Sequence, residues 1–136
     1  MSHPKHGPGF HHVAIRAIDY DATLAFYKEA FGFERRYGWG EPGSRAAMLG
    51  VGDLNYVEVF EGRPAGVAIP EGGLLHYAIR VSDVDGIYAK AIAAGATSQV
   101  EPKDVPIQGD HVVNVRLAFL VGLDGEVIEL FKNDEL

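Results

Sequence analysis

The strongest constraint on the fold of this 136-residue chain is an internal repeat, in which the second half of the sequence resembles the first. Segment 12–30, HVAIRAIDYDATLAFYKEA, aligns without gaps on segment 76–94, HYAIRVSDVDGIYAKAIAA. Later in each half, segment 45–60 aligns on segment 116–131. The offset grows between the two blocks, so the second half carries extra residues, which we place in a loop around 99–111. A repeat of this length indicates two copies of one structural module.

Each half has the pattern of a strand, then a helix, then three further strands. The first helix should begin near Asp19 or Asp21, both good N-cap residues, and stop at Gly32. Its counterpart should begin at Ser82 or Asp83 and stop at Gly95. The β-rich stretches that follow the helices are 33–39, 45–51 and 55–61 in the first half and 97–101, 112–121 and 126–132 in the second.

These patterns predict an α+β fold made of two tandem βαβββ modules within a single domain, residues 1–136. Module one covers about 10–61, a Gly- and Pro-rich linker about 62–73, and module two about 74–132. One module alone leaves a sheet face uncovered. We therefore expect two mixed sheets that pair and curl around a shared cleft.

Composition excludes several classes of protein. The chain has no cysteine, which rules out disulfides, thiolate metal sites and cysteine nucleophiles. Its net charge of -7 argues against nucleic acid or an anionic membrane as the main partner. No segment has the length and apolarity of a membrane span, and no signal-peptide pattern opens the sequence. We expect a cytoplasmic protein.

Four polar residues stand on strands that are otherwise apolar. Glu58 and Glu129 hold matched positions in strands with apolar residues on both faces, and His12 and His76 hold matched positions in the first strand of each half. A lone buried carboxylate is costly unless it is paired or bound to a metal. Taken singly, each of these residues is more often a hydrogen-bonded core histidine or a solvated glutamate than a metal ligand. Their recurrence favours one site for zinc, nickel, cobalt, manganese or iron.

In these and neighbouring residues the chain resembles the vicinal oxygen chelate superfamily, which includes glyoxalase I, bleomycin-resistance proteins, methylmalonyl-CoA epimerase and extradiol dioxygenases. The resemblance covers about residues 10–132. The segments that carry it are His12 to Arg16, Asp19, Phe26-Tyr27, Phe31-Gly32-Phe33, His76 to Val81, Asp124-Gly125 and Ile128 to Phe131.

The resemblance implies two modules around a metal cleft that holds one divalent ion. It implies His12, Glu58, His76 and Glu129 as the metal ligands. Glu58 is the discriminating position, because glyoxalase I has Glu there, the epimerase has Gln, and extradiol dioxygenases generally use only the other three ligands. Two positions depart from glyoxalase I: Gly62 stands where Asn is frequent, and the turn at 122–125 reads GLDG instead of DPDG.

The preferred function is therefore a glyoxalase-like isomerase or lyase acting on a small α-hydroxycarbonyl or thiohemiacetal-type substrate. Proton transfer would run through a metal-bound enediolate, with Glu129 or Glu58 as the catalytic residue. Arg16 and Arg80 would bind anionic parts of the substrate, and Trp39 would form part of the pocket wall. By analogy with the family we expect a homodimer, in which the site is sometimes completed across the interface.

Two alternatives stay open. An Fe(II) extradiol-type dioxygenase would use His12, His76 and Glu129. A metal-free drug-binding protein of the bleomycin-resistance type would use none of these residues as metal ligands. His11, which has no counterpart in the repeat, is expected to have no chemical role. His111 is either a pocket residue or a solvated loop histidine.

Overall fold

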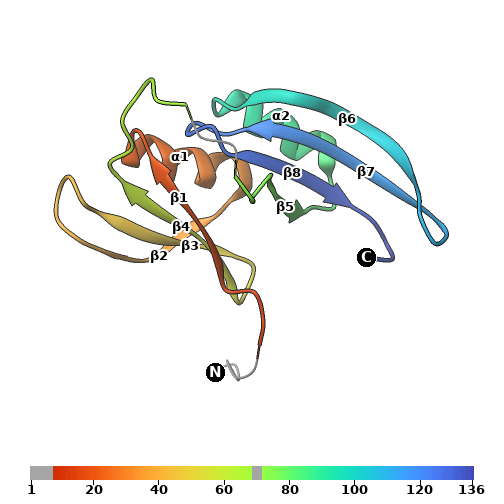
Figure 1. The fold of residues 1–136 in the computed structure, drawn as a ribbon, viewed down its shortest axis with the longest axis horizontal. Coiled ribbons are helices and arrows are strands. Elements are labelled where there is room, and N and C mark those ends of the chain that lie inside the picture. Colours follow the sequence, from red (N-terminus) through yellow and green to blue (C-terminus); the bar gives the residue numbers. More distant parts are fainter. Residues whose placement is uncertain (1–7, 69–71) are drawn as a thin grey trace.

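A computed structural model describes residues 8–68 and 72–136 of the chain. Within these ranges it has two helices and eight strands, as the α+β prediction requires (Figure 1). The first module contains β1 (His12–Ala17), α1 (Tyr20–Phe31), β2 (Glu34–Trp39), β3 (Ala46–Val51) and β4 (Asn55–Glu61), and the second contains β5 (Tyr77–Arg80), α2 (Val84–Ala93), β6 (Thr97–Gln108), β7 (Val112–Val121) and β8 (Val127–Lys132).

The two modules have the same sheet topology. The strand order is β1-β4-β3-β2 in the first sheet and β5-β8-β7-β6 in the second. In each sheet the first strand pairs in parallel with the last, and the other pairings are antiparallel. The prediction of two mixed βαβββ sheets is therefore confirmed. The linker predicted at about 62–73 falls partly outside the described residues, at 69–71.

Both helices begin at an aspartate whose side chain caps the helix N-terminus, as predicted. The Asp19 side chain accepts a hydrogen bond from the Ala22 N–H, and Asp83 accepts one from the Gly86 N–H. Such caps satisfy donors that the first helical turn leaves free. The first helix ends at Gly32, whose φ of 73° is in the left-handed region. Neither helix is long and apolar enough to cross a membrane.

The helices meet in the middle of the molecule and share one core. α1 and α2 pack against each other, and one buried cluster joins them to the inner faces of both sheets. Phe26 and Tyr27 of α1, Leu49 of β3 and Ile128 of β8 are among its largest members. The other face of each sheet points away from this core. We call these two surfaces the open faces.

The second sheet is extended where a loop was expected. β6 runs to Gln108 and pairs with β7 as far as Val112, so the extra residues lengthen a hairpin. We predicted this strand only over 97–101, and the strand that is present continues through Pro102 and Pro106. β6 is an edge strand, and an edge strand tolerates proline because one side of its backbone needs no partner.

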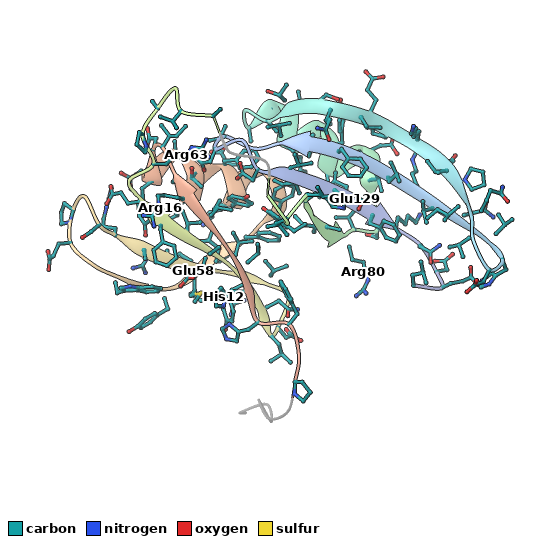
Figure 2. All side chains as sticks on the ribbon, viewed as in Figure 1. His12, Arg16, Glu58, Arg63, Arg80 and Glu129 are labelled. Carbon is teal, nitrogen blue, oxygen red and sulfur yellow. The ribbon has the colours of Figure 1, made fainter. Side chains whose placement is uncertain are left out.

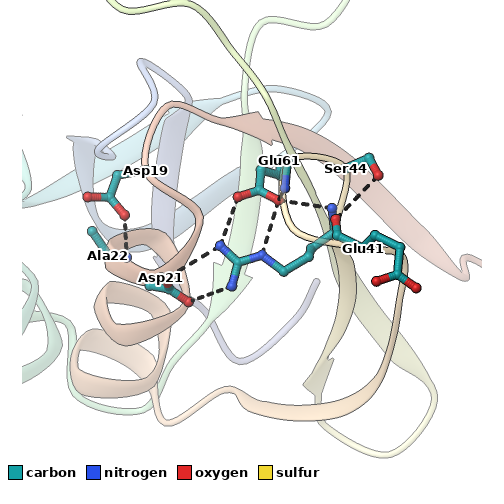
Figure 3. Close-up of polar contacts among 8 residues, drawn as sticks. Asp19, Asp21, Ala22, Glu41, Ser44 and Glu61 are labelled. Carbon is teal, nitrogen blue, oxygen red and sulfur yellow. Dashed lines mark hydrogen bonds and ion pairs between the residues drawn. The ribbon is translucent and has the colours of Figure 1, made fainter.

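An arginine clamp ties each helix to its sheet. Arg45, which precedes β3, bonds Glu61 through Nε and Nη2 at 3.1 and 2.8 Å and reaches Asp21 of α1 at 3.3 Å (Figure 3). Its repeat counterpart Arg116 bonds Asp85 of α2 at 2.8 Å. The Arg45 guanidinium lowers the pKa of Glu61 to about 2.

Candidate metal centre

The first pair of candidate ligands lies on the open face of the first sheet. The parallel register sets His12 beside Tyr56 and Ala14 beside Glu58, so the His12 and Glu58 side chains emerge next to each other. His12 Nε2 is 3.3 Å from Glu58 Oε1, and the side chains are 38% and 11% exposed. We call this pair half-site one.

The repeat builds the same pair on the second sheet. His76 Nε2 lies 3.1 Å from Glu129 Oε1, with side chains 36% and 12% exposed. Phe119 meets the His76 ring edge-on at 5.2 Å between centroids. We call this pair half-site two. In both half-sites the imidazole is partly open to solvent and the carboxylate is nearly covered.

One chain does not bring the four residues together. Among the described residues, no group of three or more side chains of the metal-binding types is close enough to hold an ion. Figure 2 shows His12 and Glu58 on the first sheet and Glu129 on the second, apart from them. The expectation that all four face one cleft is therefore wrong for a single chain, because the helices and not the open faces meet at the centre.

Each half-site has the spacing that two neighbouring ligands of one ion need. Imidazole nitrogens and carboxylate oxygens bind zinc at roughly 2.0–2.2 Å, so two ligands at right angles lie roughly 3 Å apart. The separations of 3.3 and 3.1 Å match that spacing. Two nitrogens and two oxygens also form a donor set that zinc, nickel, cobalt, manganese and iron accept. Each pair has the donor atoms and the spacing that two ligands of a divalent metal need.

Arg16 and Trp39 share the open face with half-site one. The Arg16 guanidinium lies 5.6 Å from the centroid of the Phe60 ring and donates to the Glu61 carbonyl at 3.1 Å. Trp39 meets the same Phe60 ring edge-on at 6.2 Å. Arg80 is exposed beside Phe131 on the open face of the second sheet. Each predicted substrate-binding residue thus stands on the same face as a half-site.

The two histidines outside the half-sites have different surroundings. His11 Nδ1 lies 3.0 Å from His12 Nδ1, and the His11 ring also contacts Tyr56. Successive residues of a strand point to opposite faces, but β1 begins only at His12, so this alternation does not apply to His11. His111 is exposed in the turn between β6 and β7, with Nε2 3.1 Å from Glu135.

A buried polar network at the junction of the modules was not recognised from the sequence. The Tyr27 hydroxyl of α1 contacts the Tyr77 hydroxyl of β5 and donates to Glu126 Oε2 at 2.7 Å. Burial raises the pKa of Glu126 and of both tyrosines. The sequence holds no signal for this network, because its members come from three distant segments.

A cavity of about 820 Å³ lies between β1 and the start of β5. Its walls include Val13 to Arg16 of β1, Leu74 and Leu75 before β5, and Asp124 of the turn between β7 and β8. Leu74 and Leu75 are exposed. The cavity follows the side of β1 that does not pair with β4.

Comparison with known proteins supports the fold described above. The model of the family described as the glyoxalase/bleomycin resistance protein/dioxygenase superfamily matches residues 9–130. The search of curated proteins found no match.

Several solved structures are similar to this one. Glyoxalase I from Zea mays has a TM-score of 0.71 and 25% identity, over 90% of this chain and 45% of that one, so this chain spans less than half of the maize enzyme. A glyoxalase family protein from Enterococcus faecalis has a TM-score of 0.68 and 28% identity, over 90% and 96% of the two chains. The trypanothione-dependent glyoxalase I of Leishmania major has a TM-score of 0.70 and 23% identity, over 93% and 87%.

Proposed function

The chain belongs to the glyoxalase/bleomycin resistance protein/dioxygenase superfamily, and we propose that within it the protein is a divalent-metal-dependent isomerase or lyase of the glyoxalase type. The observation that carries this proposal is the duplicated His–Glu pair. Each half of the repeat supplies one imidazole nitrogen and one carboxylate oxygen at the spacing of neighbouring metal ligands. Four such ligands leave room for two neighbouring oxygens of a small substrate.

His12, Glu58, His76 and Glu129 would hold the ion. When bound, a divalent metal polarises a substrate carbonyl and stabilises the negative charge that develops when the adjacent carbon loses a proton. Glu129, or Glu58 at the matched position, takes that proton and returns it to the neighbouring carbon. Both carboxylates suit this work because they are nearly covered by their own sheet, yet each faces the open side.

We further propose that a second copy of the chain completes the site, with half-site one of one protomer facing half-site two of its partner. The separation of the half-sites supports this, since within the described residues one chain offers only pairs of ligands. A symmetric dimer would contain two equal sites. The cavity between β1 and β5, with exposed Leu74 and Leu75 on its wall, is the surface we assign to the partner.

The sheet edges support the same assembly. The outer edge strand β2 begins with Glu34, Arg35 and Arg36 and has a register shift, and the outer edge strand β6 contains two prolines and two register shifts. Such features block pairing with another strand. β1 and β5 pair regularly and contain no proline. The edges left free for pairing are therefore the ones that border the cavity.

Elemental analysis of the purified protein tests the proposed function. We expect one divalent ion per chain in the wild-type protein. His12→Ala should abolish metal binding, and Glu58→Gln should lower the affinity for the metal. An extradiol dioxygenase would instead contain iron and tolerate Glu58→Gln, because it needs only the other three ligands. A protein that neither contains metal nor takes it up on reconstitution would contradict both enzymatic functions and favour the metal-free drug-binding alternative.

A further inference from the structure

The open face that carries half-site one also carries a row of aromatic rings, two of them exposed. Strand register places Trp39 of β2 opposite Ala46 of β3, which lies opposite Phe60 of β4. Opposed residues in a sheet share a face, so Trp39 and Phe60 are on the same side as Glu58. Tyr37 follows in the same row, with its ring centroid 5.8 Å from that of Trp39. The Tyr37 and Trp39 residues are 65% and 40% exposed.

Two guanidinium groups lie at opposite ends of this open face, Arg16 beside Phe60 and Arg36 beside Tyr56. Arg16 lies over the Phe60 ring, and among the described residues it donates only to the Glu61 carbonyl. Arg36 crosses Gly50, where an added Cβ would be 2.7 Å from Arg36 Nε. Gly50 is opposite Tyr56 and therefore belongs to the same open face. Cations gather on this face although the net charge of the chain is -7. The face is suited to an anion.

The matched face of the second sheet has a different character. Strand register collects mainly aliphatic side chains there, namely Val105, Ile107, Val113, Val115, Leu117, Phe119 and Phe131. The repeat preserved the His–Glu pairs and the neighbouring Arg–Phe pairs, Arg16 with Phe60 and Arg80 with Phe131. It did not preserve the aromatic rings of β2, because Val100 and Lys103 hold the positions that correspond to Tyr37 and Trp39. The exposed rings of Tyr37 and Trp39 belong to the first sheet, so they reflect a ligand and not the demands of the fold shared by both modules.

We propose that the substrate of this site is an aromatic anion, with a flat ring packed on Trp39 and Phe60 and a carboxylate held by Arg16. This inference rests on the proposed function and names its substrate class. Aromatic rings pack edge-on or offset against other rings, and a guanidinium binds a carboxylate through two parallel hydrogen bonds. The tripeptide adduct of a glutathione-type substrate has no ring to place on this row.

Trp39 is the only tryptophan of the chain, so its fluorescence reports directly on the proposed ring site. Three probes share two neighbouring oxygens but differ in one feature: mandelate has a ring and a charge, lactate lacks the ring, and 1-phenyl-1,2-ethanediol lacks the charge. We expect mandelate to bind roughly tenfold more tightly than lactate and several-fold more tightly than the diol. S-methylglutathione should bind more weakly than mandelate.

Variants assign these preferences to residues. Arg16→Gln should weaken mandelate several-fold and leave the diol within about twofold, because only mandelate carries the charge. Phe60→Leu should weaken mandelate and the diol alike and spare lactate. Lys90→Gln removes an equal charge from the exposed surface of α2 and should change none of the three affinities.

Titrations with and without added metal separate this inference from the proposed function. If metal binds but lactate or the diol equals mandelate, the substrate class is wrong and the metal site stands. If no metal binds, but mandelate still binds the chelator-treated protein more tightly than lactate and the diol by Trp39 fluorescence, the proposed function is wrong and the ring site stands. Failure of mandelate to bind in either state, or tighter binding of S-methylglutathione, overturns the inference.

Discussion

At the scale of single residues, equivalent positions in the repeat have different roles. Asp53 and Asp124 align, but Asp53 is exposed and Asp124 is buried. Asp124 accepts hydrogen bonds from the Ile18 N–H at 2.8 Å and from Thr23 Oγ1 at 2.7 Å, which ties module two to the start of α1. Alignment could not show this, because the partners of Asp124 lie in the other module.

We predict that Thr23→Val lowers the free energy of unfolding by about 1–3 kcal/mol, because a buried carboxylate oxygen loses its hydroxyl donor. Urea unfolding measures the change. The same substitution at exposed Thr97 serves as control and should stay within about 0.5 kcal/mol. Equal effects at the two threonines would contradict the role given to Asp124.

The pairing of each histidine with a glutamate could be predicted from the sequence, because these residues hold matched positions in the repeat. His12 with Glu58, and His76 with Glu129, lie within 3.3 and 3.1 Å of each other, in neighbouring strands as the βαβββ pattern requires. The Tyr27–Tyr77–Glu126 network could not be predicted, because no local pattern reports which distant strand will face a helix.

At the scale of elements, the ends of the helices could be predicted from the residues next to them, whereas the end of β6 could not. The aspartate caps and Gly32 placed α1 and α2 well, since a helix end is satisfied by residues within a few positions. β6 was placed badly, because whether proline ends a strand depends on whether that strand is at an edge, which is a property of the whole sheet.

The clamp of Arg45 on Glu61 predicts a particular response to acid. Because the pKa of Glu61 falls from 4.5 to about 2, its stabilising contribution is present above about pH 4.5 and is lost as pH falls toward 2. Arg45→Gln removes the partner. We expect the stability difference between wild type and this variant to be constant near neutral pH and to shrink below pH 4.5.

Unfolding followed by circular dichroism from pH 7 to pH 2 gives these differences. Lys28→Gln is the control, because Lys28 and Glu34 are 3.8 Å apart and their side chains are mostly exposed, so their pair contributes little. A difference for Arg45→Gln that does not change with pH would show that the arginine acts by packing on Tyr20, 4.5 Å away, and not through Glu61.

At the scale of the whole molecule, the sequence identified four candidate ligands but not where they meet. Pairing of strands within each module brings His to Glu, and packing of α1 on α2 then turns the two open faces outward. Which faces meet depends on contacts between modules, and these are spread over many residues with no motif. The proposed dimer resolves this by letting the half-sites of two chains face each other.

Mixing two disabled chains tests that central claim most directly. One variant carries His12→Ala and Glu58→Gln, the other His76→Ala and Glu129→Gln, so neither alone can form a complete site. Refolded together, a dimer with one chain of each kind regains one intact site if half-sites pair between copies. We predict metal uptake of roughly one ion per four chains in the mixture for random pairing, and none in either variant alone. A mixture that takes up no metal, while the wild-type protein refolded in the same way does, would contradict a site shared between copies.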